Sequence, residues 1–73
     1  MNAQPEHQLR RRRLDGAMTL SQLAALAECD KGHLSKIENW RLMPSHDLMV
    51  RLCRLLPGLE PNDFFAEFAE AHQ

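Results

Sequence analysis

Apolar residues recur along most of this chain at the spacing of an α-helix. Two stripes show it most clearly: Leu20, Leu23, Ala24 and Ala27, and then Leu48, Leu52, Leu55 and Leu56. The first follows i, i+3, i+4, i+7 and the second i, i+4, i+7, i+8, which places each set on one helical face. Nowhere do apolar and polar residues alternate with period two for long enough to predict a strand. The pattern therefore predicts an all-α fold.

Helix-start signals stand in front of these stripes. Thr19 and Gln22 form a T-x-x-Q capping box, and Asp30 and Ser45 have side chains that cap helix N-termini well. Pro61 suits the first turn of a helix because its φ is already fixed near the helical value. Together with the stripes, these signals predict five helices, over residues 6–15, 20–27, 31–39, 45–56 and 62–71.

The length of 73 residues fits a single domain, residues 1–73, in which residues 1–4 are expected to be disordered. A chain of this size buries only about 60% of the surface that its unfolded form exposes, so a partner subunit would add stability. The longest apolar run, residues 23–27, is too short for a signal-peptide core or a membrane span, which favours a cytoplasmic protein. Cys29 and Cys53 lack metal-site or disulfide-framework spacing and are expected to be reduced core thiols.

Charge is distributed unevenly along the chain. The formal net charge is −1, yet all nine Lys and Arg residues lie between Arg10 and Arg54. Residues 1–56 therefore carry a net charge of +3, whereas residues 57–73 carry four acids and no Lys or Arg. This asymmetry indicates one face for an anionic partner and another that turns away from it.

The connection between the second and third predicted helices is short. Residues 27–30 leave about three residues to turn the chain, which forces a steep crossing of the kind found in a helix-turn-helix. The stretch "MTLSQLAALAECDKGHLSKIENWRLMPS" resembles the DNA-binding domain of the lambda-repressor-like (Xre/Cro-type) regulators. The resemblance rests on Leu23-Ala24, the polar start of the third helix, Ile37-Glu38 and Pro44-Ser45. It covers about residues 9–65.

The resemblance implies that the third helix is the recognition helix of a helix-turn-helix. Lys31, Gly32 and Lys36, with His33 beside them, would then occupy positions that read base edges in the major groove. Lysine suits guanine O6 and N7, and Gly32 would let the helix backbone approach the groove floor closely.

The resemblance also implies which residues hold phosphates and which hold the domain together. It places Asn39, Arg41 and the backbone amides of Ser45 and His46 at positions that hold phosphates. We add two further candidates, Arg10 from the run of four arginines at 10–13, and Thr19. Arg13 and Glu38 match a buried ion pair that joins the first helix to the third. The alternative for this pair is an ordinary surface contact worth less than about 1 kcal/mol.

Three residues depart from the family pattern. Glu28 stands at the usual turn glycine, Trp40 replaces the glycine that ends the third helix, and Leu20 replaces a polar residue that touches phosphate in many members. A left-handed conformation at Glu28 or Trp40 would cost about 1 kcal/mol or more relative to glycine. Either Asn39 takes that conformation, or the turn differs. Trp40 would plug the edge of the core or lie along the DNA backbone.

Several function classes find no support in the sequence. The four histidines and two cysteines show no zinc-ligand spacing, and no nucleophile motif, phosphate-binding loop or carboxylate pair indicates an enzyme. We expect no metal, cofactor or small-molecule ligand. The predicted function is a sequence-specific regulator of double-stranded DNA, most simply a repressor. The alternatives are the antitoxin of a toxin–antitoxin pair, with its protein partner on the last two helices, and a helical adaptor that does not touch DNA.

The predicted last helix carries an unusually wide apolar face. Phe64, Phe65 and Phe68 lie within one helical turn, so one stripe could close the core while the other needs cover. We therefore expect residues 62–71 to form a dimerisation helix and the protein to bind a pseudo-palindromic operator as a homodimer.

Overall fold

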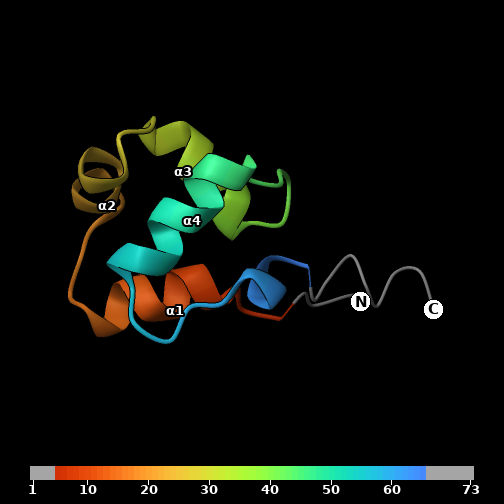
Figure 1. Ribbon diagram of the computed structural model, residues 1–73. Coiled ribbons are helices and arrows are strands. Elements are labelled where there is room, and N and C mark those ends of the chain that lie inside the picture. Colours follow the sequence, from red (N-terminus) through yellow and green to blue (C-terminus); the bar gives the residue numbers. More distant parts are fainter. Residues whose placement is uncertain (1–4, 66–73) are drawn as a thin grey trace.

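The computed structural model describes residues 5–65, which fold into four α-helices and one 3-10 helix (Figure 1). The elements are α1 (Gln8–Asp15), α2 (Leu20–Ala27), α3 (Lys31–Glu38), α4 (His46–Leu55) and the 3-10 helix η1 (Pro61–Phe64). No strand occurs in this part of the chain, so the all-α prediction is confirmed there. α2 and α3 are joined by a short turn and pack on each other, α2 also packs against α4, and α1 lies beneath them (Figure 1).

The predicted caps of α2 and α4 are present. The Gln22 amide donates to Thr19 Oγ1 at 3.0 Å, and the Thr19 amide donates to Gln22 Oε1 at 2.8 Å, which completes the capping box. Ser45 Oγ accepts from the Leu48 amide at 3.3 Å, so Ser45 stands just before α4. These side chains satisfy amides that a helix N-terminus leaves without a partner.

The first helix begins later than predicted, because His7 is its N-cap. His7 is extended, with ψ 134°, and its ring Nδ1 accepts from the Leu9 amide at 3.0 Å. The helix thus spans Gln8–Asp15 and not 6–15. Histidine is absent from the usual N-cap set of Ser, Thr, Asp and Asn, so the sequence carries no ordinary start signal at this position.

The prediction of a fifth α-helix over residues 62–71 is wrong for the residues described. Pro61 does open a helix, but it is the four-residue 3-10 helix η1, and Phe65 is its C-cap. The side chain of Phe64 is fully buried in the core of the protomer, so Phe64 is removed from the predicted dimer surface. Phe65 is exposed, and Phe68 lies outside the described residues.

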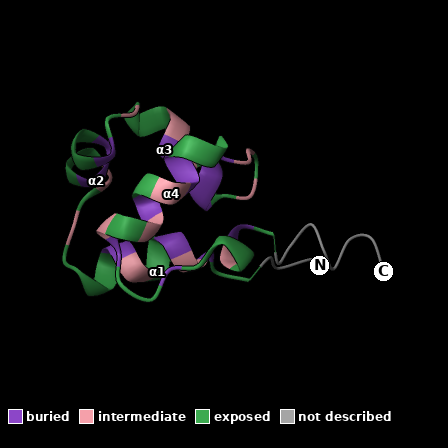
Figure 2. Ribbon diagram, in the orientation of Figure 1, coloured by how far each residue is buried: buried purple, intermediate pink, exposed green. Residues whose placement is uncertain are grey.

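One apolar core joins all five elements. Figure 2 shows the buried segments facing the interior, where the two stripes predicted from the sequence meet. The fully buried large side chains are Leu9, Leu23, Leu34, Ile37, Leu52, Leu56 and Phe64. Burying each of them contributes about 1.5–3 kcal/mol relative to leaving it in water. Two small buried residues, Ala24 and Ala27, leave room for α2 to lie close to its neighbours.

Three successive helices end in the same way, with a left-handed residue that is not glycine. Ala17, Glu28 and Trp40 have φ values of 57°, 58° and 61°. After each, the next amide donates to the carbonyl five residues back, as in a Schellman motif: Met18 to Arg13, Cys29 to Ala24 and Arg41 to Lys36. Asn39 has φ −98°, so the alternative in which Asn39 takes the left-handed position is wrong. Glu28 and Trp40 adopt it themselves.

The ion pair implied by the family resemblance is present and buried. Arg13 Nε donates to Glu38 Oε2 at 2.7 Å and Arg13 Nη2 donates to Glu38 Oε1 at 3.1 Å, while the two side chains are only 8% and 4% exposed. Arg13 Nη1 also donates to the Met18 carbonyl at 2.9 Å. The hydrogen bond with Glu38 raises the pKa of Arg13, against the effect of burial. The pair therefore fixes α1, the turn before α2 and the end of α3 to one another.

We predict that Glu38→Ala destabilises the fold by about 3–5 kcal/mol, because it leaves the guanidinium of Arg13 buried without its counter-charge. A loss of this size approaches the whole stability of a small domain, about 5 kcal/mol. Glu6→Ala is the matched control, since Glu6 pairs with arginines only at the surface. Urea unfolding measures both. Equal free energies of unfolding for the two variants would contradict the prediction.

His7 is a buried aromatic link as well as a cap. It is 2% exposed, and its ring centroid lies 4.2 Å from that of Trp40 and 5.3 Å from that of Phe64. Burial lowers the pKa of His7, and the carboxylates of Glu38 and Asp63 partly oppose this shift. Because Nδ1 accepts a hydrogen bond, the cap requires the neutral ring.

We predict that stability falls as the pH is lowered from 7 to 5. The pKa of His7 is lower in the fold than its unfolded value of about 6.5, so in this range the unfolded chain binds a proton that the folded chain does not. The contribution of neutral His7 is therefore present above pH 6.5 and is lost toward its folded pKa, at up to about 1.4 kcal/mol per pH unit. His7→Asn keeps a side chain that can cap but does not titrate. Its urea midpoint should fall less over the same range, and parallel curves would contradict the assignment to His7.

Candidate nucleic-acid interface

The first turn of α3 is organised by Asp30. Its Oδ2 accepts from the amides of Gly32 at 2.9 Å and His33 at 3.3 Å, as an N-cap does. A Cβ at residue 32 would lie 2.9 Å from the same Oδ2, too close for an ordinary contact. A side chain at residue 32 would therefore require the Asp30 carboxylate to shift.

The predicted base-reading residues lie on the outer side of α3. Leu34, Ile37 and Glu38 are buried, so they form the inner face of the helix. Lys31, Gly32 and Lys36 are exposed, and His33 is half-buried. At 100° per residue, Gly32 and Lys36 point within about 40° of each other, whereas Lys31, in the first turn, points about 140° from Lys36. Both lysines of α3 are therefore exposed.

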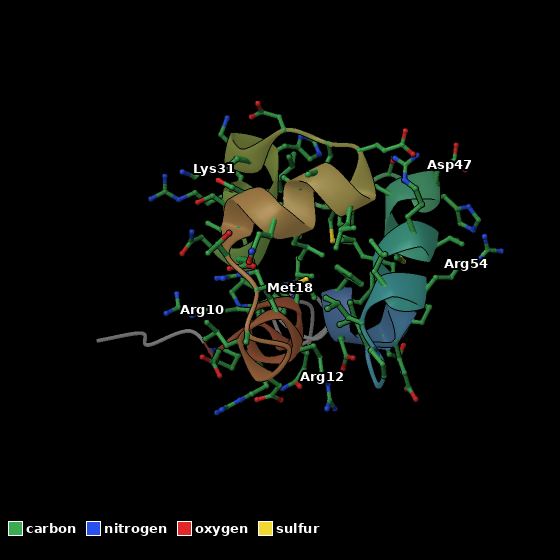
Figure 3. The ribbon with its side chains drawn as sticks, turned by 90° about the vertical axis from the view of Figure 1, so that its left-hand side faces the viewer. Arg10, Arg12, Met18, Lys31, Asp47 and Arg54 are labelled. Atoms are coloured by element: carbon green, nitrogen blue, oxygen red, sulfur yellow. The ribbon has the colours of Figure 1, made fainter. Side chains whose placement is uncertain are left out.

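Arg10 of α1 shares the side of the molecule on which Lys31 lies. Figure 3 places both at the same side and Asp47 and Arg54 at the opposite side. The Arg10 side chain is 53% exposed, and its Nε lies 3.6 Å from Glu6 Oε2. The other carboxylate oxygen, Glu6 Oε1, lies 3.1 Å from Arg11 Nε. These exposed pairs are weak and exchange readily with other anions.

A hollow of about 290 Å³ lies between the N-terminal segment and the end of α3. Two predicted phosphate-contacting residues from different elements line it, Arg10 on α1 and Asn39 just after α3. Asn39 Nδ2 donates to the Ser35 carbonyl at 2.7 Å, which holds the amide against the helix end. The remaining lining residues are Pro5, Glu6, His7, Glu38 and Trp40.

The other predicted phosphate contacts are more scattered. Thr19 is exposed, but its Oγ1 already accepts within the capping box, and Arg41 is exposed just after α3. Ser45 and His46 are exposed at the start of α4, where Asp47 Oδ1 lies 4.0 Å from His46 Nδ1. Since Asp47 is on the far side from Lys31 and Arg10 in Figure 3, the start of α4 is separate from the cluster around α3.

Two residues outside the predicted site complete its surroundings. His7 and Trp40 stack on each other, and Trp40 Nε1 donates to the Pro5 carbonyl at 2.8 Å. The departure of Trp40 from the glycine of the family pattern is the one sequence signal for this arrangement. His7 gives none, because a lone histidine before a helix has many possible roles.

Metal-ligand groups and membrane-spanning helices are both absent from the described part of the chain. Residues 5–65 contain no group of three or more His, Cys, Asp or Glu side chains that could hold a metal ion. The helices described there are too short and too polar to span a membrane. Cys29 and Cys53 are free, half-buried thiols whose pKa values are raised by burial.

Comparison with known proteins agrees with this geometry. A family model described as a helix-turn-helix domain matches residues 7–60. No curated protein and no solved structure matches the chain. The matched region runs from the cap of α1 to just before η1 and contains all of α2, the turn and α3. The chain therefore belongs to the helix-turn-helix domain family, in keeping with its resemblance to the lambda-repressor-like regulators.

Proposed function

We propose that this protein is a sequence-specific regulator that binds double-stranded DNA through α3. The observation that carries the proposal is the exposed lysine-bearing face of α3, with Arg10 on the same side of the molecule (Figure 3). The helix-turn-helix family match supports DNA as the partner. An overall charge of −1 makes nonspecific binding by bulk charge a weak alternative, so the local arrangement of cations matters.

In this proposal the first turn of α3 enters the major groove. Lys31 and Lys36 would donate to guanine O6 and N7, and His33 would reach a neighbouring base edge. Arg10, Asn39 and Arg41 would hold backbone phosphates, which fix the register of the helix without reading sequence. Occupying an operator in this way excludes other proteins from it, so repression needs no further activity.

A single recognition helix reads too few bases for a usable operator, so we propose a homodimer. Two copies related by a two-fold axis would place their recognition helices about 34 Å apart, one turn of DNA. Phe65 is 44% exposed at the end of η1, next to the core residue Phe64, and is the candidate centre of the contact. The net negative charge of residues 57–73 fits a surface that faces away from phosphate.

We predict that Lys31→Ala or Lys36→Ala weakens binding to the preferred duplex by about 1–3 kcal/mol and relaxes selectivity at one base position. The preferred duplex comes from a binding selection on random sequences, followed by fluorescence anisotropy on single-base variants. Arg54→Ala is the matched control because Arg54 lies on the opposite side of the molecule (Figure 3). A uniform loss over all duplexes, with the salt slope reduced by about one, would reassign these lysines to phosphates.

We also predict that Phe65→Glu abolishes dimerisation while the helical circular dichroism is kept, because Phe65 is exposed in the protomer. Leu26→Glu is the matched control, since Leu26 is 57% exposed on α2. Light scattering gives the mass of each variant. A parent protein that is monomeric at tens of micromolar, and that binds one chain per operator, would refute the dimer.

A further inference from the structure

Trp40 occupies a backbone position that disfavours it. Its φ of 61° lies in the left-handed region, where a bulky side chain is strained and glycine is not. Ala17 and Glu28 have the same conformation at the ends of α1 and α2. Neither makes a side-chain hydrogen bond or ring contact like those of Trp40. Trp40 therefore differs from these two residues in the contacts that its indole makes.

The indole ties the end of α3 to the N-terminal segment. Trp40 Nε1 donates to the Pro5 carbonyl at 2.8 Å, across 35 positions of sequence, and its ring stacks on His7 with centroids 4.2 Å apart. His7 in turn caps α1 through the Leu9 amide. One side chain therefore fixes both the path of residues 5–7 and the point at which α1 begins.

Arg10 lies in the first turn of α1, three residues after that cap. Its place beside Asn39 in the 290 Å³ hollow thus depends on where α1 starts relative to the end of α3. The ion pair of Arg13 and Glu38 joins the same two helices three residues further along, whereas the His7 cap and its stack on Trp40 fix the first turn of α1, which carries Arg10.

We propose that Trp40 is a positioning residue for DNA-phosphate binding, which holds the N-terminal segment across the end of α3 so that Arg10 and Asn39 grip one backbone phosphate. This inference rests on the proposed DNA-binding function.

The charges around the hollow suit an incoming phosphate. Glu38 is neutralised by Arg13, and His7 is uncharged in its role as a cap. Glu6 is paired with both Arg10 and Arg11 and is closer to Arg11, at 3.1 Å against 3.6 Å. When Arg10 turns to a phosphate, Glu6 keeps Arg11 as its partner. The exchange therefore replaces one exposed ion pair by another and leaves no carboxylate without a partner.

The test is a double-mutant cycle between Trp40 and Arg10, read by fluorescence anisotropy on the selected duplex over a series of salt concentrations. We expect Trp40→Gly and Arg10→Ala each to weaken binding about five- to tenfold at low salt and to lower the salt slope by about one, the value of one lost phosphate. The double variant should bind no more weakly than Arg10→Ala alone, because both changes remove the same contact. Base preference should be unchanged in all three.

Three further variants isolate the cause. Glu28→Gly relieves the same left-handed strain at the end of α2 and should leave DNA binding unchanged. Trp40→Phe keeps a ring against His7 but loses the N–H, and should fall between the parent and Trp40→Gly. Lys31→Ala combined with Trp40→Gly should show multiplied losses, because Lys31 acts on bases and not through Arg10.

Two results would overturn the inference, and they are distinguishable. If the parent binds its duplex but the losses from Trp40→Gly and Arg10→Ala multiply, Trp40 does not act through Arg10. If the parent shows no salt-dependent preference for any duplex, the proposed function is wrong, and this inference, which rests on it, is wrong as well. If Trp40→Gly loses its cooperative urea transition, the cycle is run with Trp40→Phe in its place. Losses of DNA affinity that multiply between Trp40→Phe and Arg10→Ala would then contradict the inference.

Discussion

The buried pair of Arg13 and Glu38 is the contact on which the arrangement of this domain depends. It joins the middle of α1 to the last residue of α3, and through the Met18 carbonyl it also holds the turn that leads into α2. Apolar packing drives folding, but it is not directional and would tolerate small shifts of one helix along another. Two hydrogen bonds between charged, planar groups do not tolerate them. The pair therefore fixes how α1 and α3 lie relative to each other.

The turns between helices show how a short chain makes steep crossings. Ala17, Glu28 and Trp40 each accept a left-handed backbone at the same place in three consecutive helices, and the following amide closes the helix end. A left-handed conformation costs each of them about 1–2 kcal/mol relative to glycine. The repeated geometry keeps the connections short and directs α2 and α3 across each other, as the helix-turn-helix requires.

Much of this structure follows from local sequence signals, and the exceptions have physical reasons. The stripes of α2 and α4, the Thr19 capping box and the Asp30 cap are decided by neighbouring residues, so the sequence predicts them well. The partner of Arg13 lies 25 positions away and came only from the family resemblance. The His7 cap is local, but histidine is absent from the usual N-cap residues, so it gave no start signal. The stack of His7 on Trp40 joins residues more than 30 positions apart, for which no local pattern exists. The three phenylalanines fit a helical face and so predict a fifth α-helix, whereas the described start of that segment forms the 3-10 helix η1.

The position of Trp40 also makes it a natural fluorescence probe of the domain. The chain contains one tryptophan and no tyrosine, so its ultraviolet emission comes essentially from a single indole. That indole is in contact with His7 and lines the hollow that Arg10 and Asn39 share. A protonated imidazole quenches indole emission more strongly than a neutral one, and an ion entering the hollow would alter its solvent shell. We therefore expect a change at the junction between α1 and α3 to alter the emission of the unlabelled protein.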